Sequence, residues 1–182
     1  MKAFYHADSQ ALTIRTRLIS RHLNREPQRS RFSALLGVLE GADLKTTTAT
    51  GLIDAGLFAR AGGPGEREML IEAVLEYARR ARFNGLPSRA GALFLTPTLG
   101  EAKRFAELVP VRCGHIHCCL AEPDDGALLD WSLIAPAASW DLDAPLDRLA
   151  AMADAYWSAA NSGDPLWEFV THGQVMVLQR ME

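Results

Sequence analysis

The sequence predicts a mixed α+β fold, with strands at both ends of the chain and helices mainly between them. Two observations lead to this prediction. Residues 2–5 and 167–179 show the short apolar runs and the alternation that are typical of strands, whereas residues 66–83 carry apolar side chains at helical spacing. The order of these segments does not alternate regularly along the chain, which argues against a repeated βαβ unit and a parallel sheet.

Length and composition are those of a globular protein with one core. The 182 residues are 48% hydrophobic and 23% charged, and we expect a single domain over residues 1–182. The net charge of -3 argues against a general nucleic-acid binder, although residues 15–31 contain six Arg and one acid. No apolar run is long enough for a membrane span. The oligomeric state stays open.

The beginning of the chain and the cysteines bear on the compartment. Residues 1–6 lack the apolar core of a signal peptide. We therefore expect a cytoplasmic protein, or one that is delivered to a host or target cell without a classical signal peptide. Three cysteines, two of them adjacent, do not form a disulfide framework and fit a reducing compartment.

Two strands are predicted near the N-terminus. Residues 2–5 form a first strand that ends at His6. Residues 11–19 alternate between apolar and polar side chains, which is the period of a half-buried second strand. The Arg-rich residues 20–31 contain a proline and are read as a solvated connection or a short helix.

Two helical segments are predicted next, with a loop between them. Residues 32–39 have apolar side chains at helical spacing. Residues 41–65 are rich in Gly and Thr and are expected to be surface loop, with a short apolar turn at 52–58. The clearest helix covers residues 66–83, and Asn84-Gly85 supplies its stop signal.

A strand, a tight corner and a helix are predicted over residues 91–106. The apolar run of the strand is stopped by Pro97, which cannot donate to a sheet ladder. Thr98 and Glu101 have the spacing of a capping box at the start of a helix. The corner would bring the Thr96 hydroxyl close to helix-start amides, which suits a polar or anionic ligand. The same pattern also fits an ordinary strand-to-helix junction.

The last third of the chain is predicted to contain four strands and one helix. The helix runs from about Pro145 to Asn161, with Asp143 as a possible N-cap. The strands are expected at residues 111–120, 128–134, 167–170 and 174–179, and the strand at 128–134 is interrupted by Asp130.

Glu168 is the most unusual polar residue in these segments. It lies within the apolar run 167–170, and a carboxylate in apolar company costs free energy to bury unless it is paired or used. An acid that faces solvent on an edge strand is the structural alternative. For His6, at the end of the first strand, the alternative is a polar rim residue.

Three separated blocks of the sequence resemble the motif blocks of the ADP-ribosyltransferase superfamily. They are Phe4-Tyr5-His6, the run Gly91 to Thr96 with Ala102 and Phe105 behind it, and Trp167-Glu168-Phe169-Val170. The match is to the branch with a His, an aromatic residue and a Glu. That branch includes diphtheria-toxin-like enzymes, poly-ADP-ribose polymerases and the small rifampicin-modifying transferases. The resemblance implies a split antiparallel β-sandwich with helices, which binds NAD between its sheets.

The resemblance also implies a set of NAD-binding residues. His6 would hydrogen-bond the adenosine ribose or the nicotinamide side of NAD, with Tyr5 beside it. Phe94 and Thr96 would line the same pocket. Phe105 would take the place of the aromatic residue that stacks on nicotinamide, where the commonest family pattern has a Tyr.

Glu168 and His6 would be the catalytic residues. Cleavage of the nicotinamide–ribose bond passes through an oxocarbenium-like state, which a carboxylate such as that of Glu168 can stabilise. Arg89, just before the central strand, has the chemistry to contact a pyrophosphate, and its alternative is a surface Arg. Because position 166 is Leu, the double-acid signature of arginine-modifying members is missing, and an Arg target is less expected.

The function implied is that of a mono-ADP-ribosyltransferase with NAD as co-substrate. The acceptor stays open and could be a protein side chain, a nucleic acid or a small molecule such as an antibiotic. The biological role is equally open between a bacterial toxin, an effector and a resistance enzyme. The alternative is a catalytically silent module of the same fold that binds NAD, ADP-ribose or a protein.

A second group of reactive side chains lies in the strand around residues 113–119. The pleat would place Cys113, His115, His117 and Cys119 on one face. Neighbouring positions of one flat strand cannot surround a tetrahedral zinc ion, so no metal site is expected. A nucleophilic Cys113 or Cys118 paired with a His is a further alternative.

Overall fold

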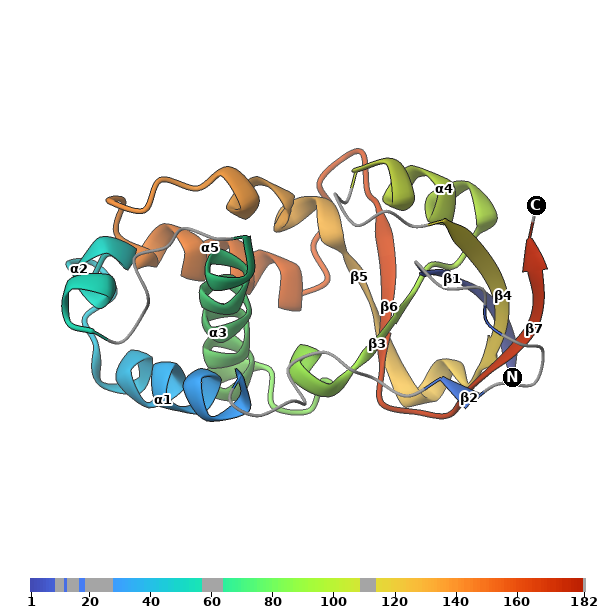
Figure 1. Cartoon of the computed structure of the whole chain (residues 1–182), viewed down its shortest axis with the longest axis horizontal. Helices are drawn as coiled ribbons and strands as arrows, with labels where there is room; N and C mark the ends of the chain where they lie inside the picture. The colour runs from blue at the N-terminus through green and yellow to red at the C-terminus, as the bar shows by residue number, and fades with distance from the viewer. Residues whose placement is uncertain (9–11, 13–16, 19–27, 57–63, 109–113, 182) are drawn as a thin grey trace.

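Helices gather at one end of the molecule and strands at the other. The computed structural model describes residues 1–8, 12, 17–18, 28–56, 64–108 and 114–181. The helices are α1 (Gln28–Gly41), α2 (Ala49–Asp54), α3 (Pro64–Arg82), α4 (Leu99–Leu108) and α5 (Leu146–Trp157). In Figure 1, all of these except α4 form the left-hand part. None of the described helices combines the length and the apolar character needed to cross a membrane.

The strands form two antiparallel sheets. Their bounds are β1 (Lys2–Asp8), β2 (Arg17–Leu18), β3 (Leu93–Leu95), β4 (His115–Ala121), β5 (Gly126–Asp130), β6 (Trp167–Thr171) and β7 (Val175–Met181). The larger sheet has the order β1-β4-β7-β2, and the smaller one has the order β3-β6-β5. Every pairing in them is antiparallel, so the predicted α+β class is confirmed.

The two sheets touch at one backbone junction. Tyr5 of β1 forms an antiparallel bridge with Thr96, directly after β3. The Tyr5 amide donates to the Thr96 carbonyl at 2.8 Å, and the Thr96 amide donates to the Tyr5 carbonyl at 2.7 Å. The predicted strand and the corner that follows it are therefore the place where the two sheets meet.

The small sheet is covered on both faces. On one face, Val170 and Leu129 belong to the large apolar cluster of the helices. On the other face, Leu95 and Phe169 belong to a second cluster, where the Phe169 ring stacks on Phe4 with centroids 4.4 Å apart. Burial on both faces explains why β6 reads as a nearly continuous apolar run.

Most of the predicted elements are confirmed within the described residues. The helix expected at 66–83 is α3, and residues 32–39 lie inside α1. The strands expected at 2–5, 167–170 and 174–179 are β1, β6 and β7. The strand expected at 111–120 is described from residue 114 onward and is β4.

The loop predicted at 41–65 needs a correction. Residues 49–54 form helix α2, because the Thr48 side chain caps it by accepting a hydrogen bond from the Gly51 amide at 3.0 Å. Of the strand predicted at 11–19, only residues 12 and 17–18 are described, and Arg17–Leu18 pairs with β7. Residues 20–27 of the predicted connection lie outside the described part.

Two boundaries after β4 were also wrong. The strand predicted at 128–134 ends at Asp130. The Asp130 carboxylate accepts hydrogen bonds from the amides of Ser132 and Leu166, and the chain turns there into a short 3-10 helix. The helix predicted at 145–161 ends at Trp157. Its N-cap is Pro145, and Asp143 instead accepts a hydrogen bond from the Thr50 hydroxyl.

Candidate functional site

Glu168 lies at the centre of a buried polar network between the small sheet and the helices. Only 1% of the residue is exposed. Its Oε1 atom accepts hydrogen bonds from the Arg89 guanidinium and from the Tyr156 hydroxyl, the latter at 2.8 Å. The Oε2 atom accepts no hydrogen bond from the part of the chain that the structure describes. One carboxylate oxygen is therefore anchored and the other is not.

Arg89 connects Glu168 to helix α3. Its Nε atom lies 3.1 Å from a carboxylate oxygen of Glu72, and its Nη1 atom donates to the Tyr156 hydroxyl at 2.6 Å. The guanidinium also lies over the Phe94 ring, with Cζ 4.5 Å from the centroid, which is a cation–π contact. The network thus joins β6, α5, α3 and β3 through one arginine that precedes β3.

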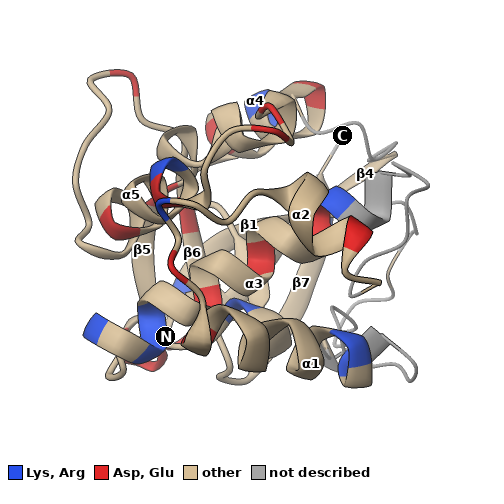
Figure 2. Cartoon of the chain, turned by 90° about the vertical axis from the view of Figure 1, so that its left-hand side faces the viewer, with Lys and Arg blue, Asp and Glu red and all other residues tan. Residues whose placement is uncertain are grey.

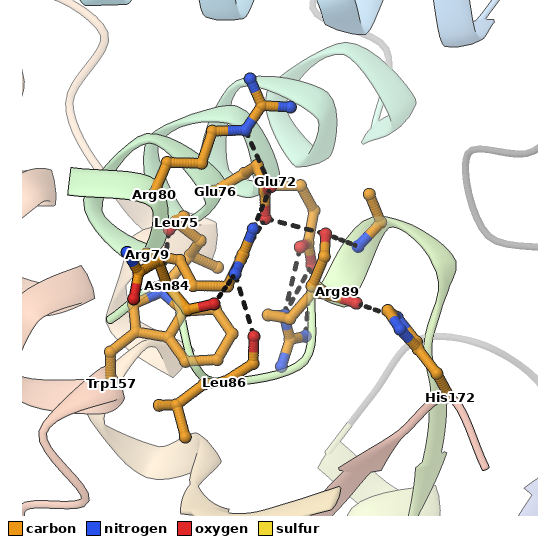
Figure 3. A network of polar contacts seen from close by, with 12 residues as sticks. Glu72, Leu75, Glu76, Arg79, Arg80, Asn84, Leu86, Arg89, Trp157 and His172 are labelled. Atoms are coloured by element: carbon orange, nitrogen blue, oxygen red, sulfur yellow. Dashed lines mark hydrogen bonds and ion pairs between the residues drawn. The ribbon is translucent and has the colours of Figure 1, made fainter. Parts of the chain in front are cut away.

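Neighbouring hydrogen bonds hold the segment that carries Arg89. The Ser88 hydroxyl donates to Glu76 of α3 at 2.8 Å, and a ring nitrogen of His172 lies 2.7 Å from the Ser88 carbonyl. Figure 3 shows Glu76, Arg89 and His172 within this network. Glu76 also accepts two hydrogen bonds from Arg79. These contacts fix the backbone on the N-terminal side of Arg89 against the helices.

The charge state of the network follows from burial and pairing. Burial raises the pKa of Glu168, while Arg89 and the Tyr156 hydroxyl oppose the rise. Burial works against the charge of Arg89, but Glu168 and Glu72 outweigh it and raise its pKa well above the usual value. Burial also raises the pKa of Tyr156 well above its usual value. Tyr156 is therefore a neutral phenol that donates a hydrogen bond to Glu168.

His6, Tyr5 and Thr96 lie at the junction of the two sheets. The His6 Nδ1 atom lies 3.0 Å from the Phe94 carbonyl, to which it can only donate, and its Nε2 atom lies 3.4 Å from an Asp8 carboxylate oxygen. Thr96 is 6% exposed, and its hydroxyl lies 3.3 Å from the carbonyls of Tyr5 and Thr98. His6 thus fastens β1 to β3 as well as carrying a titratable ring.

The register of the strands divides the predicted site residues between two faces. Tyr5 lies opposite Thr96, and Phe94 lies opposite Val170. Because side chains alternate along a strand and opposed residues share a face, Tyr5, Thr96 and Phe94 share the face of Glu168. The same alternation places His6 on the other face of β1.

Phe105 lies in α4, beyond the junction. Its ring packs edge-on against Trp131, with centroids 5.3 Å apart. The predicted capping pair at the start of α4 is partly formed, because the Glu101 amide donates to the Thr98 hydroxyl at 3.2 Å. The Thr98 hydroxyl in turn donates to the Glu101 carboxylate at 2.7 Å. A carboxylate therefore occupies the corner that the sequence suggested for an anionic ligand.

The structure brings Arg89, Phe94 and Glu168 into direct contact, and sequence reasoning missed two members of the network. Tyr156 lies on the apolar face of α5 and is fully buried there. Glu72 lies on α3 beside that helix's apolar stripe, with its side chain 12% exposed. A pairing between residues so far apart in the sequence leaves no local signal. The one clue was a Tyr on a buried face, because a buried hydroxyl needs a partner.

The cysteine and histidine strand offers less. Burial and the neighbouring Cys118 raise the pKa of Cys119 to about 12, which leaves its thiol protonated. Cys113 lies outside the described residues. Within the part that the structure describes, no three His, Cys, Asp or Glu side chains are grouped to hold a metal ion.

Comparisons with known proteins add no assignment. No protein-family model matches the sequence, and the search of characterised proteins found no significant match.

Proposed function

We propose that this protein binds NAD and acts as a mono-ADP-ribosyltransferase. The observation that carries the proposal is the arrangement around Glu168. A buried acid on β6 shares one sheet face with Phe94 and Thr96, next to the junction of two antiparallel sheets. These residues come from two of the three sequence blocks that resemble the ADP-ribosyltransferase superfamily, and Tyr5 of the remaining block bridges to Thr96 at the junction. A split pair of antiparallel sheets is the architecture that the resemblance implies.

The reaction would use the charge of Glu168. Nicotinamide leaves with the electron pair of the glycosidic bond, and the ribose carbon becomes oxocarbenium-like. A carboxylate that hydrogen-bonds a ribose hydroxyl stabilises this positive charge. The acceptor then forms a bond to the same carbon and loses its proton. The acceptor stays open among protein side chains, nucleic acids and small molecules.

Arg89 would change partners when NAD binds. In the structure, Arg89 forms ion pairs with Glu168 and Glu72, and the residue is 7% exposed. A pyrophosphate offers a guanidinium two oxygens in bidentate geometry, like a carboxylate. If Arg89 turned from Glu168 to the pyrophosphate, it would free the carboxylate while keeping its own charge compensated by Glu72.

A catalytically silent NAD- or ADP-ribose-binding module is the second candidate. One observation favours it: Glu168 is only 1% exposed and is paired with Arg89, as in a structural ion pair. In this case the network would serve to join the small sheet to helices α3 and α5. Binding would then use residues of the junction, such as Tyr5 and His6.

An assay that separates binding from turnover tests both candidates. The purified protein is incubated with NAD labelled in its nicotinamide and, in parallel, in its adenine, with and without a cell lysate. An enzyme releases labelled nicotinamide and transfers the adenine label to an acceptor. A silent module raises its melting temperature with NAD but releases no nicotinamide. If the protein releases no nicotinamide and shows no thermal shift at millimolar NAD, both candidates are refuted.

A further inference from the structure

We propose that Tyr156 is the positioning residue for Glu168: it anchors Oε1 and so leaves Oε2 to meet the ribose hydroxyl. The inference rests on the proposed ADP-ribosyltransferase function and adds a residue that lies in none of the three sequence blocks. Tyr156 comes from helix α5.

The geometry separates the two oxygens of the carboxylate. Tyr156 donates to Oε1 at 2.8 Å, and Arg89 donates to the same atom. The Tyr156 ring is held by its own surroundings, because the residue is fully buried and its ring packs edge-on against Trp157 at 4.9 Å. A hydroxyl on a fixed ring can hold one carboxylate oxygen in place, so the direction of the other is fixed as well.

Tyr156 and Arg89 differ in what a second ligand would do to them. Arg89 carries a charge that an anionic ligand attracts, and it already divides its donors between Glu168 and Glu72. Tyr156 is neutral, and within the described residues its hydroxyl donates to Glu168 alone. Once Arg89 turns toward a pyrophosphate, Tyr156 is the remaining anchor of Oε1 among the described residues. Its hydrogen bond also stabilises the ionised carboxylate that the reaction needs.

The test compares Tyr156→Phe with wild type in nicotinamide release as a function of pH. The substitution removes one hydroxyl and keeps the ring. We expect kcat to fall about tenfold or more, because a hydrogen bond to a charged group is lost, while KM for NAD changes little. The acid limb of the kcat profile should move to higher pH, because the carboxylate loses a donor that favours its charged form. A purely structural role would not move this limb.

Tyr77→Phe is the matched control. Tyr77 lies on α3, is half-buried, and its hydroxyl makes no hydrogen bond within the described residues. Its replacement should leave both kcat and the acid limb unchanged. If Tyr156→Phe folds poorly, site-specific fluorination of the Tyr156 ring provides a second variant. A more acidic phenol is a stronger donor and should move the acid limb to lower pH.

The outcomes separate this inference from the proposed function. A wild type that releases nicotinamide, with Tyr156→Phe equal to it in kcat and acid limb, would overturn the role of Tyr156 and leave the transferase proposal standing. A wild type that releases no nicotinamide would overturn both. A slower variant with a shifted limb, beside an unchanged Tyr77→Phe, is the result we expect.

Discussion

Replacing Glu168 by Gln separates a catalytic carboxylate from a structural one, because the two side chains have the same shape. The Gln amide oxygen can still accept the hydrogen bonds that Tyr156 and Arg89 now donate to Oε1. Arg89 also keeps the charge of Glu72, 3.1 Å away, so no buried charge is left without a counter-charge. Gln is therefore the least disruptive substitution at this position.

The expected loss of stability is small. The hydrogen bond from Tyr156 becomes a neutral one and that from Arg89 loses the charge of its acceptor, which costs about 1 kcal/mol, while the burial penalty of the carboxylate disappears at the same time. Burial raises the pKa of Glu168, which shows that its charge is disfavoured by the surroundings. For a chain of this length, a change of about 1 kcal/mol corresponds to a shift of about 2–4 °C in Tm.

The expected loss of activity is much larger. Under the proposed function, Glu168→Gln removes the negative charge that would stabilise the oxocarbenium-like state, so nicotinamide release should slow by about 100-fold, or about 2.7 kcal/mol. The NAD dissociation constant should stay nearly unchanged, because the charge acts mainly in the transition state. The measurements are the release rate, the Kd for NAD and the Tm of wild type and variant. Equal release rates would remove Glu168 from the mechanism.

Three further predictions concern His6, Phe105 and Glu76. NAD should raise the Tm of the wild type, and His6→Ala should abolish most of that shift relative to its own Tm without NAD; an undiminished shift would take His6 out of the NAD site. If the Phe105 ring stacks on nicotinamide, Phe105→Ala should weaken NAD binding by about 1 kcal/mol, whereas Phe105→Tyr should bind NAD as the wild type does. A loss of NAD affinity in the Tyr variant as well would mean that the ring only packs against Trp131. Burial alone would raise the pKa of Glu76, but hydrogen bonds from Arg79, Ser88 and Arg80 lower the pKa from its usual 4.5. The ionised Glu76 therefore stabilises the folded state above about pH 4.5, and this contribution is lost as the pH falls further. The urea midpoint should therefore fall between about pH 5 and pH 3, and less steeply in Glu76→Gln than in the wild type.

The elements of the fold could be predicted where the local pattern and the tertiary environment agree. Helix α3 has an apolar face at helical spacing, and that face packs into the helical core. Strand β5 shows the opposite case, since the apolar run continues past Asp130 whereas the strand ends there. A side chain that accepts the amides of Ser132 and Leu166 ends the strand there. The sequence marks Asp130 as an interruption, but one of these amides lies 36 residues away, so the local pattern does not show that the strand ends there.

The candidate site shows the same division between local and long-range information. The sequence marked Glu168 because an acid in apolar company needs a partner, and the structure supplies that partner in Arg89. It could not identify Tyr156, whose ring belongs to the apolar face of α5 and whose hydroxyl alone enters the network. Nor could it show that Arg89 is enclosed by Glu72, Phe94 and Tyr156, because these residues come from three separate elements. A buried arginine between two carboxylates is costly to assemble. If either carboxylate is removed, the other still balances the charge of the arginine. Under the proposed function, this arrangement would allow Arg89 to give up Glu168 for an anionic ligand without becoming an isolated buried charge, because Glu72 would remain its counter-charge.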